Sequence, residues 1–240
     1  RGDLGIEVPY YDVPTIQKML IKKANLKGMP VITATQMLLS MTQNERATRA
    51  EISDVANAVL DGTDVVMLSE ESAVGEDPIN VVDTMHNIIA KTEDIYNYDK
   101  QYKFPYLDEF DVIQSTVTKL ADDLKANGIL ALTSSGKSAL KMSRYRPKTP
   151  IFTFTHKKKV LNSLTAVWGV EPIGTIKEAQ ASKMFQKMLK ALDEKGLLNR
   201  NGLYVATVGY PVGMPGSTNT IKILTPSEIE SYLNFKEEEI

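Results

Sequence analysis

Short apolar segments alternate with amphipathic helical patterns along almost the whole chain, and this alternation restricts the fold more than any other feature. Residues 31–35 and 65–68 are short, apolar and largely β-branched, which predicts buried strands. Apolar stripes with helical spacing over residues 14–25, 48–60 and 78–89 predict helices around these strands. Because parallel strands need long crossover connections, usually helices, this order predicts an α/β fold with a parallel sheet.

The predicted helices carry recognisable start and stop signals. Thr48 and Glu51 have the spacing of a capping box, in which each side chain accepts a hydrogen bond from the other residue's backbone amide. Gly62 can close that helix in a left-handed conformation. Asp77 followed by Pro78 predicts the cap and the first residue of the next helix.

The second half of the chain repeats the alternation as a separate predicted domain. Residues 96–110 are rich in Tyr, Asp and Lys without periodicity, so we place a boundary there and predict domains at 1–95 and 96–240. Helices are predicted over 111–127, closed by Gly128, near 160–166 and over 181–192. Strands are predicted at residues 129–132, 151–154, 203–208 and 220–224, with a charged, solvated tail at 236–239.

Composition and charge exclude several classes of protein. The 240 residues carry 28 Lys and Arg against 30 Asp and Glu, so no positive field favours nucleic acid or an anionic membrane as a partner. No apolar run approaches the roughly 18 residues that span a bilayer. Cysteine is absent, which excludes disulfides and thiolate chemistry and fits a cytoplasmic protein. No Met precedes Arg1, which we interpret as a sign of a processed chain or a fragment.

Three polar positions in the first half lie where parallel α/β folds place chemistry, just beyond the carboxyl ends of strands. They are Asp3 between two glycines, Thr35, and Ser69 at the start of a Ser-Glu-Glu run. A carboxylate in a glycine-flanked turn suits a hard cation such as Mg²⁺. The alternatives are a turn residue, a cap and a helix start. Arg1-Gly2-Asp3 also spells an adhesion tripeptide, but nothing in the sequence suggests secretion.

The second half offers a hydroxyl-rich loop between a predicted strand and helix, from Thr133 to Ser138. Its hydroxyls, glycine and lysine could hold a phosphate, although an ordinary Ser-rich turn explains the same residues. The loop is not a P-loop, because Ala131 stands where that motif needs glycine. A second glycine-rich loop at 209–219 could close over the same site or form only a long connection.

The two histidines offer no support for a zinc site or a catalytic triad. His86 is predicted to be a partly buried helix residue, and His156 to adjoin a solvated run of three lysines. Arg49, at the start of a predicted helix, could bind an anion or a neighbouring subunit, and a plain surface position is equally compatible with the sequence.

Taken together, several motifs resemble the pyruvate kinase family, of a bacterial type, and follow one another at that family's spacing. In the first half they are Arg1-Gly2-Asp3-Leu4-Gly5, Ala34-Thr35-Gln36-Met37-Leu38, Thr48-Arg49-Ala50-Glu51, residues 53–62 and residues 67–73. In the second half they are Thr133 to Ser138, Ser143-Arg144-Tyr145-Arg146-Pro147 and residues 215–219. The resemblance covers essentially the whole chain.

The resemblance implies the last β/α units of a (β/α)₈ TIM barrel followed by a separate three-layer α/β C-terminal domain. The chain would begin at the end of the sixth barrel strand. The family's catalytic Lys, a second metal-binding Glu, the K⁺ ligands and the lid domain would lie upstream. Since two strands cannot close a barrel, the chain is expected to be inactive alone.

For the whole enzyme, the resemblance implies phosphoryl transfer from phosphoenolpyruvate to ADP in a cytoplasmic homotetramer. Asp3 would bind Mg²⁺ or Mn²⁺, the Gly2 and Asp3 amides the substrate carboxylate, and Thr35 the carbon that is protonated. Ser69 would support proton delivery, Arg1 would anchor the loop, and Arg49 would reach towards the subunit interface.

The resemblance also implies an effector site in the second half. A sugar-phosphate or nucleotide effector would bind Thr133, Ser134, Ser135, Gly136, Lys137 and Ser138, with Gly216 and Ser217 closing over it. Val212 replaces the Arg common in forms activated by a bisphosphate, so a monophosphate is at least as compatible. The remaining alternative is a stand-alone effector-binding module without catalysis.

Overall fold

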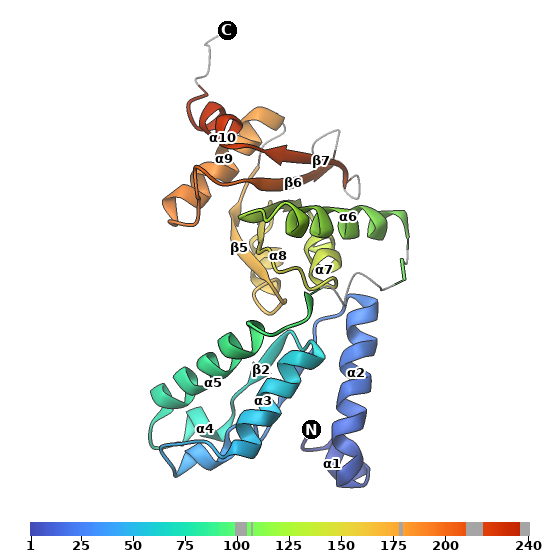
Figure 1. Cartoon of the computed structure of the whole chain (residues 1–240), viewed down its shortest axis with the longest axis vertical. Helices are drawn as coiled ribbons and strands as arrows, with labels where there is room; N and C mark the ends of the chain where they lie inside the picture. Colours follow the sequence, from blue (N-terminus) through green and yellow to red (C-terminus); the bar gives the residue numbers. More distant parts are fainter. Residues whose placement is uncertain (99–104, 107, 178–179, 210–217, 236–240) are drawn as a thin grey trace. The chain divides into compact units, whose positions relative to one another are not determined.

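The chain folds into two units, each with its own sheet and its own core. The computed structural model describes residues 1–98, 105–106, 108–177, 180–209 and 218–235, and the chain divides into Arg1–Lys100 and Gln101–Ile240 (Figure 1). Composition had predicted a boundary five residues earlier, after residue 95. No described helix combines the length and the apolar character that crossing a membrane requires.

The first unit is built around two parallel strands, β1 (Ile32–Ala34) and β2 (Val65–Met67), which pair from Ile32 with Val65 to Ala34 with Met67. The helices are α1 (Leu4–Glu7), α2 (Val13–Lys27), α3 (Arg49–Asp61), α4 (Glu70–Ala73) and α5 (Pro78–Glu93), with 3₁₀ turns at Tyr10–Asp12 and Leu39–Thr42. Helix α3 connects the two strands, as the alternation predicted. In the core of the first unit, α3 and α5 pack against the segment after β1. The buried residues of this core are Met37, Leu38, Met41, Val55, Ala58, Val81 and Met85.

The residues predicted to start and end the helices of this unit do so in the structure. Thr48 and Glu51 form the capping box of α3, and Gly62 closes the helix with a left-handed φ of 92°. The Asp77 side chain accepts a hydrogen bond from the Asn80 amide at the start of α5.

The second unit is a five-stranded sheet in the order β5-β4-β3-β6-β7, parallel except for β7. Its strands are β3 (Gly128–Thr133), β4 (Ile151–Thr155), β5 (Val170–Thr175), β6 (Tyr204–Gly209) and β7 (Thr218–Leu224). Its helices are α6 (Glu109–Asp123), α7 (Lys137–Ser143), α8 (Lys158–Ser163), α9 (Ala181–Glu194) and α10 (Pro226–Leu233). The α/β class is therefore confirmed in both units.

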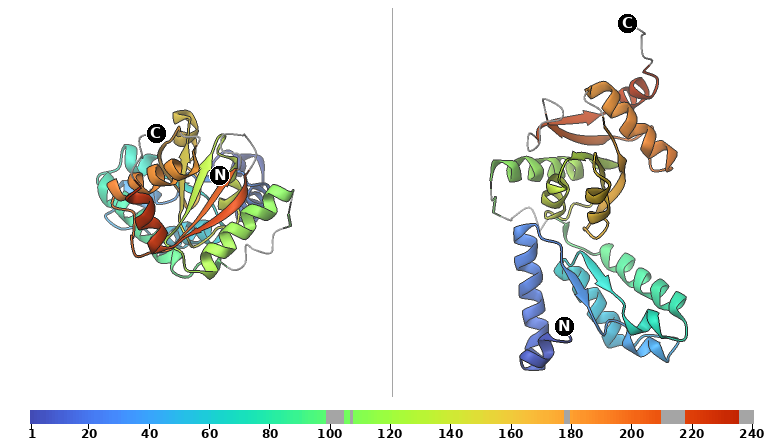
Figure 2. Two further views of the ribbon diagram at one scale, coloured as in Figure 1. Left: turned by 90° about the horizontal axis from the view of Figure 1, so that it is seen from above. Right: turned by 180° about the vertical axis from the view of Figure 1, so that it is seen from behind.

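Alternate residues of the central strands contribute to two cores, one on each face of this sheet. The sheet with helices on both faces gives the unit three layers. Leu130 of β3 packs in one core with residues of α9 and α10, and Ile129 packs in the other with Val117 of α6. The views show α6 on one side of β6 and β7 and α9 and α10 on the other (Figure 1, Figure 2).

Two sequence-based expectations for this unit were wrong or incomplete. Gly128 does not close the preceding helix: α6 ends at Asp123, Lys125 takes the left-handed turn at φ 50°, and Gly128 begins β3. Helix α10 was not predicted, although Thr225 and Glu228 cap it as a second capping box. The charged segment 236–239 lies outside the described residues.

Gly128 is required by its neighbours rather than by its backbone conformation. A Cβ atom there would lie 2.3 Å from Cε2 of Phe152 and 3.2 Å from Cδ1 of Tyr204, because rings on both neighbouring strands close over β3. Both rings are buried, so neither has free space to move into.

We therefore expect Gly128→Ala to lower the free energy of unfolding of the second unit by about 1–3 kcal/mol through overpacking. The single Trp, Trp168, is buried in this unit, so its fluorescence during urea unfolding measures the change. Gly174→Ala is the matched control, because nothing lies within 4 Å of its Cβ position. Equal midpoints for the two variants would contradict the packing argument.

Candidate functional site

Two of the predicted site residues of the first unit, Thr35 and Ser69, lie just beyond the carboxyl ends of β1 and β2. Thr35 directly follows β1, and its Oγ1 accepts a hydrogen bond from the Gly2 amide at 3.2 Å. Ser69 follows β2 and caps α4 without a side-chain hydrogen bond. The structure thus brings Arg1, Gly2 and Thr35 into one hydrogen-bonded network. The side chain of Glu71 connects Ser69 to the segment after β1.

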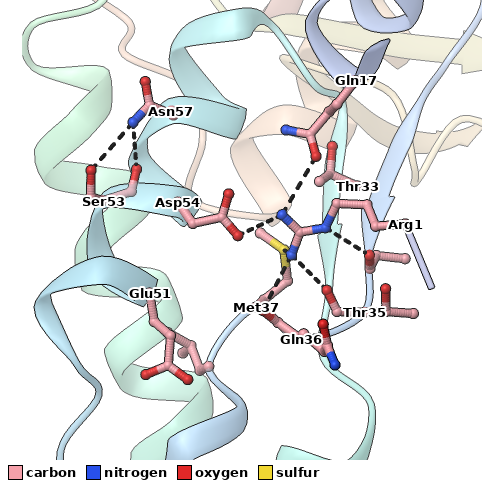
Figure 3. A network of polar contacts seen from close by, with 12 residues as sticks. Arg1, Gln17, Thr33, Thr35, Gln36, Met37, Glu51, Ser53, Asp54 and Asn57 are labelled. Atoms are coloured by element: carbon pink, nitrogen blue, oxygen red, sulfur yellow. Dashed lines mark hydrogen bonds and ion pairs between the residues drawn. The ribbon is translucent and has the colours of Figure 1, made fainter. Parts of the chain in front are cut away.

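The Arg1 guanidinium holds the turn that follows β1 (Figure 3). Its Nε donates to the Ala34 carbonyl at 3.2 Å, and its Nη2 donates to the carbonyls of Thr35 at 2.6 Å and Gln36 at 3.2 Å. Its Nη1 pairs with Asp54 of α3 at 2.5 Å. One cation therefore satisfies three consecutive carbonyls and is itself balanced by a carboxylate.

The turn that Arg1 holds is strained. Thr35 and Gln36 have φ values of 71° and 53°, in the left-handed region that non-glycine residues rarely adopt. Each such residue costs about 1–2 kcal/mol, and the cost is larger for a β-branched side chain. The turn directs the Thr35 hydroxyl towards Gly2, so the strain falls on a candidate site residue.

Glu71 ties the segment after β1 to the segment after β2, a role that the sequence did not reveal. Its side chain is buried, with 1% of its surface exposed. Oε1 accepts from the amides of Met37 and Leu38 at 3.2 and 3.1 Å, and Oε2 accepts from the Ser69 amide at 2.7 Å. Burial alone would raise the pKa of Glu71, but these hydrogen bonds outweigh it and hold the pKa below its usual value.

Asp3 presents a carboxylate that the local fold does not use for capping. It is the N-cap residue of α1, makes no side-chain cap hydrogen bond and is exposed. Within the described ranges, no three Asp, Glu or His side chains come together as a ready metal site. One exposed carboxylate fits a hard divalent cation that takes its other oxygens from elsewhere, as Mg²⁺ commonly does.

Arg49 is the first residue of α3 and is exposed. The chain is described alone, so its expected place at a subunit interface stays a prediction.

In the second unit, the loop from Thr133 to Ser138 forms a tight turn after β3. The Gly136 amide donates to Thr133 Oγ1 at 3.0 Å, and Gly136 has a left-handed φ of 86°. Ser135 and Lys137 are exposed. Ser138 Oγ lies 3.4 Å from Oγ1 of Thr218. Thr218 directly follows the two residues that are expected to close over the effector. Gly216 and Ser217 themselves, and Val212, lie outside the described residues.

Helix α7, which follows this loop, is fixed at its other end by buried charges. The Arg144 guanidinium pairs with Asp111 of α6 and donates to the Pro105 carbonyl at 2.6 Å. Lys141 Nζ lies 3.4 Å from carboxylate oxygens of Asp108 and Asp111. Burial raises the pKa of the adjacent Tyr145 phenol far above its usual range.

Of the two histidines, His86 differs from its predicted surroundings, and His156 adjoins exposed lysines as predicted. His86 is exposed on α5 rather than partly buried. His156 is half-buried, with Nε2 at 3.2 Å from Ser134 Oγ and Nδ1 at 3.2 Å from the Ile176 carbonyl oxygen. The lysines after it, 157–159, are exposed as expected.

The Glu71 bonds generate a prediction. Because the pKa of Glu71 is lowered, its ionised form stabilises the folded loop above the usual glutamate pKa of about 4.3, and this contribution disappears as the pH falls below it. We expect Glu71→Gln to cost about 1–3 kcal/mol locally at neutral pH, because the glutamine NH2 group cannot accept a hydrogen bond and so leaves at least one of these backbone N–H groups without its acceptor.

Hydrogen exchange of the Met37, Leu38 and Ser69 amides would measure this loss as an acceleration of about tenfold or more. The difference from the wild type should shrink as the pH falls through the lowered pKa of folded Glu71, because the carboxyl group is then protonated in both the folded and the unfolded state. Glu70→Gln, at the exposed neighbouring position, is the control and should leave exchange unchanged. Equal exchange in both variants would refute the role of Glu71.

Comparison with known protein families finds two adjacent matches along the chain. The family model described as pyruvate kinase, barrel domain, matches residues 1–82, and the one described as pyruvate kinase, alpha/beta domain, matches residues 111–224. Their order agrees with the two units of the structure.

Curated relatives give the same result over nearly the whole chain. A pyruvate kinase of Lactobacillus delbrueckii subsp. bulgaricus is 43% identical over 93% of this chain and 39% of its own length. One of Clostridium acetobutylicum is 44% identical over 93% of this chain and 48% of its own. One of Geobacillus stearothermophilus is 43% identical over 95% of this chain and 40% of its own. The chain thus spans less than half the length of these relatives.

Both family models match this chain, one after the other. The chain therefore belongs to the pyruvate kinase family, as the end of the barrel domain followed by the α/β domain.

Proposed function

We propose that this chain forms part of an enzyme that transfers the phosphoryl group of phosphoenolpyruvate to ADP, giving pyruvate and ATP, the last step of glycolysis. The observation that carries the proposal is the Arg1 network, which sets Gly2, the residue before Asp3, against Thr35 at the carboxyl edge of the β1–β2 pair. Parallel β/α folds place their chemistry at this edge. By itself the chain offers two strands of a barrel and is inactive.

Each residue has a part in binding or proton transfer under this proposal. The exposed Asp3 carboxylate holds Mg²⁺ or Mn²⁺, which when bound stabilises the charge of the phosphoryl group and of the enolate. The Gly2 and Asp3 amides bind the substrate carboxylate, which then replaces Thr35 Oγ1 as the acceptor of the Gly2 N–H. The Thr35 hydroxyl stands beside the carbon that receives a proton, and Ser69 supports the delivery of that proton.

The remaining parts of the proposal concern the assembly. The K⁺ ligands lie outside this chain, and the exposed Arg49 contributes to a contact between subunits of a cytoplasmic homotetramer. In the second unit, the loop from Thr133 to Ser138 binds a sugar-phosphate or nucleotide effector. Its exposed Lys137 and Ser135 support this role, since an ammonium group and a hydroxyl can both donate hydrogen bonds to phosphate oxygens.

Substitution in the longer enzyme tests the catalytic proposal. Joined to an upstream barrel like that of its relatives, the chain with Asp3→Asn should lose about 10²–10³-fold in the rate of pyruvate formation, as expected for removing one electrostatic contact to the transition state. Glu7→Gln, an exposed carboxylate on the same segment, is the matched control and should keep the wild-type rate. Wild-type turnover in Asp3→Asn would reject Asp3 as the metal ligand.

A second candidate function is a stand-alone module that binds a phosphate effector without catalysis. The second unit favours it, because its sheet is covered on both faces and has two cores of its own.

A thermal titration tests effector binding in either case. A sugar phosphate at about 100 times its Kd should stabilise the second unit by about 2.7 kcal/mol, seen as a rise in the Trp168 melting temperature. Lys137→Gln should abolish most of the rise, whereas Lys195→Gln, an exposed lysine after α9, should preserve it. No rise with any sugar mono- or bisphosphate would reject the effector site.

A further inference from the structure

His156 and Ser134 meet because neighbouring parallel strands end at the same height. Thr133 of β3 pairs with Thr155 of β4, so the residue after each strand end emerges beside the other. His156 Nε2 lies 3.2 Å from Ser134 Oγ. On its other side, His156 Nδ1 lies 3.2 Å from the carbonyl oxygen of Ile176, the residue after β5. The imidazole is therefore held between the ends of three strands.

The Ile176 carbonyl fixes which ring nitrogen can exchange its proton. A carbonyl oxygen only accepts hydrogen bonds, so Nδ1 must carry a hydrogen in both the neutral and the charged imidazole. The proton that His156 gains or loses is consequently the one on Nε2, the atom that faces Ser134.

This arrangement makes the direction of the His156–Ser134 hydrogen bond depend on protonation. With a neutral ring, Nε2 is an acceptor, so the Ser134 O–H donates to it and is occupied. With a charged ring, Nε2–H donates to Ser134 Oγ, and the hydroxyl hydrogen becomes available to another acceptor. Protonation of His156 therefore adds a positive charge and one free donor to the loop that follows β3.

The segments that meet at His156 carry lysines and no carboxylates among their described residues. The loop 133–138 contributes Lys137, the start of α8 contributes Lys157, Lys158 and Lys159, and the end of β5 leads to Lys177. The loop and α8 are packed together, since a Cβ on Gly136 would contact Val160 and Leu164. Among the described residues of these segments, an anion bound at Ser134 would thus find only cationic charged groups, and none of these residues carries an acidic side chain that could compete for the freed hydroxyl.

We propose that His156 is a specificity-determining residue of the loop 133–138, which binds phosphate-bearing ligands together with a proton taken up on Nε2. When His156 is protonated, Ser134 donates to the anion; when His156 is neutral, Ser134 donates to His156 and the anion loses that contact. Affinity for the anion accordingly rises as the pH falls. The proposal rests on the effector site proposed above and adds the residue that controls it.

Inorganic sulfate is a suitable first probe, because it remains a dianion from acidic to alkaline pH whereas phosphate changes its own charge. In the whole 240-residue chain, calorimetry should show sulfate bound about tenfold more tightly at about pH 5.5 than at about pH 8, the gain expected for one charge-assisted hydrogen bond. Titration in two buffers of different ionisation enthalpy should show proton uptake on binding.

Variants separate His156 from the general effect of pH. His156→Gln cannot be protonated and should bind sulfate with an affinity that no longer rises as the pH falls. His86→Gln removes the other histidine of the chain, which is exposed in the first unit, and should retain the tenfold rise.

The tautomer of His156 gives an independent test that needs no ligand. The chain has two histidines, so the His86→Gln variant leaves a single imidazole in a nitrogen-15 NMR spectrum. The neutral ring should carry its hydrogen on Nδ1, and a hydrogen on Nε2 would overturn the proposal. Sulfate binding that is equally strong at both pH values would overturn the role of His156 and leave the effector site standing. Absence of sulfate and sugar-phosphate binding at either pH would overturn both.

Discussion

The candidate site depends on two opposite charges that hold two strand ends in place. The Arg1 guanidinium binds three successive carbonyls after β1, and the Glu71 carboxylate binds amides after both β1 and β2. Backbone groups at strand ends have lost their sheet partners, and leaving them buried and unsatisfied would cost about 1–3 kcal/mol each. The strained turn at Thr35 persists because these side chains hold it.

The main features of the fold could be predicted from the sequence, because they depend on local patterns. The alternation of apolar strands and helical stripes and the capping box at Thr48 act over a few residues and operate as expected. The interpretation of Gly128 was wrong because a glycine after a helix usually closes it, whereas this one is required by rings from two other strands. Such contacts over long sequence separations cannot be recognised from spacing. Helix α10 carries a local signal of the same kind, the Thr225–Glu228 capping box, so its start is predictable from spacing.

Only part of the site could be predicted from the sequence, for the same physical reason. The positions of Thr35 and Ser69 follow from the rule that parallel strands present their carboxyl ends on one edge, whereas Asp3 lies at the start of α1 and no described strand precedes it. The sequence does not distinguish Glu70 from Glu71, although one is exposed and the other is buried against three amides. His156 likewise adjoins a run of exposed lysines, and its contact with Ser134 arises only from the register of β3 with β4.

The buried charges of α7 limit how the loop before it can change shape. This helix has seven residues, so it is only about 10 Å long, and it begins at the left-handed Gly136. Its far end is anchored by Arg144 and Asp111, and separating one member of a buried ion pair typically costs about 3–5 kcal/mol. A helix this short, anchored at its far end, cannot bend to accommodate a displacement of its first turn. A rearrangement of the loop must therefore either end at Gly136 or move the whole of α7, together with α6, in a single discrete step.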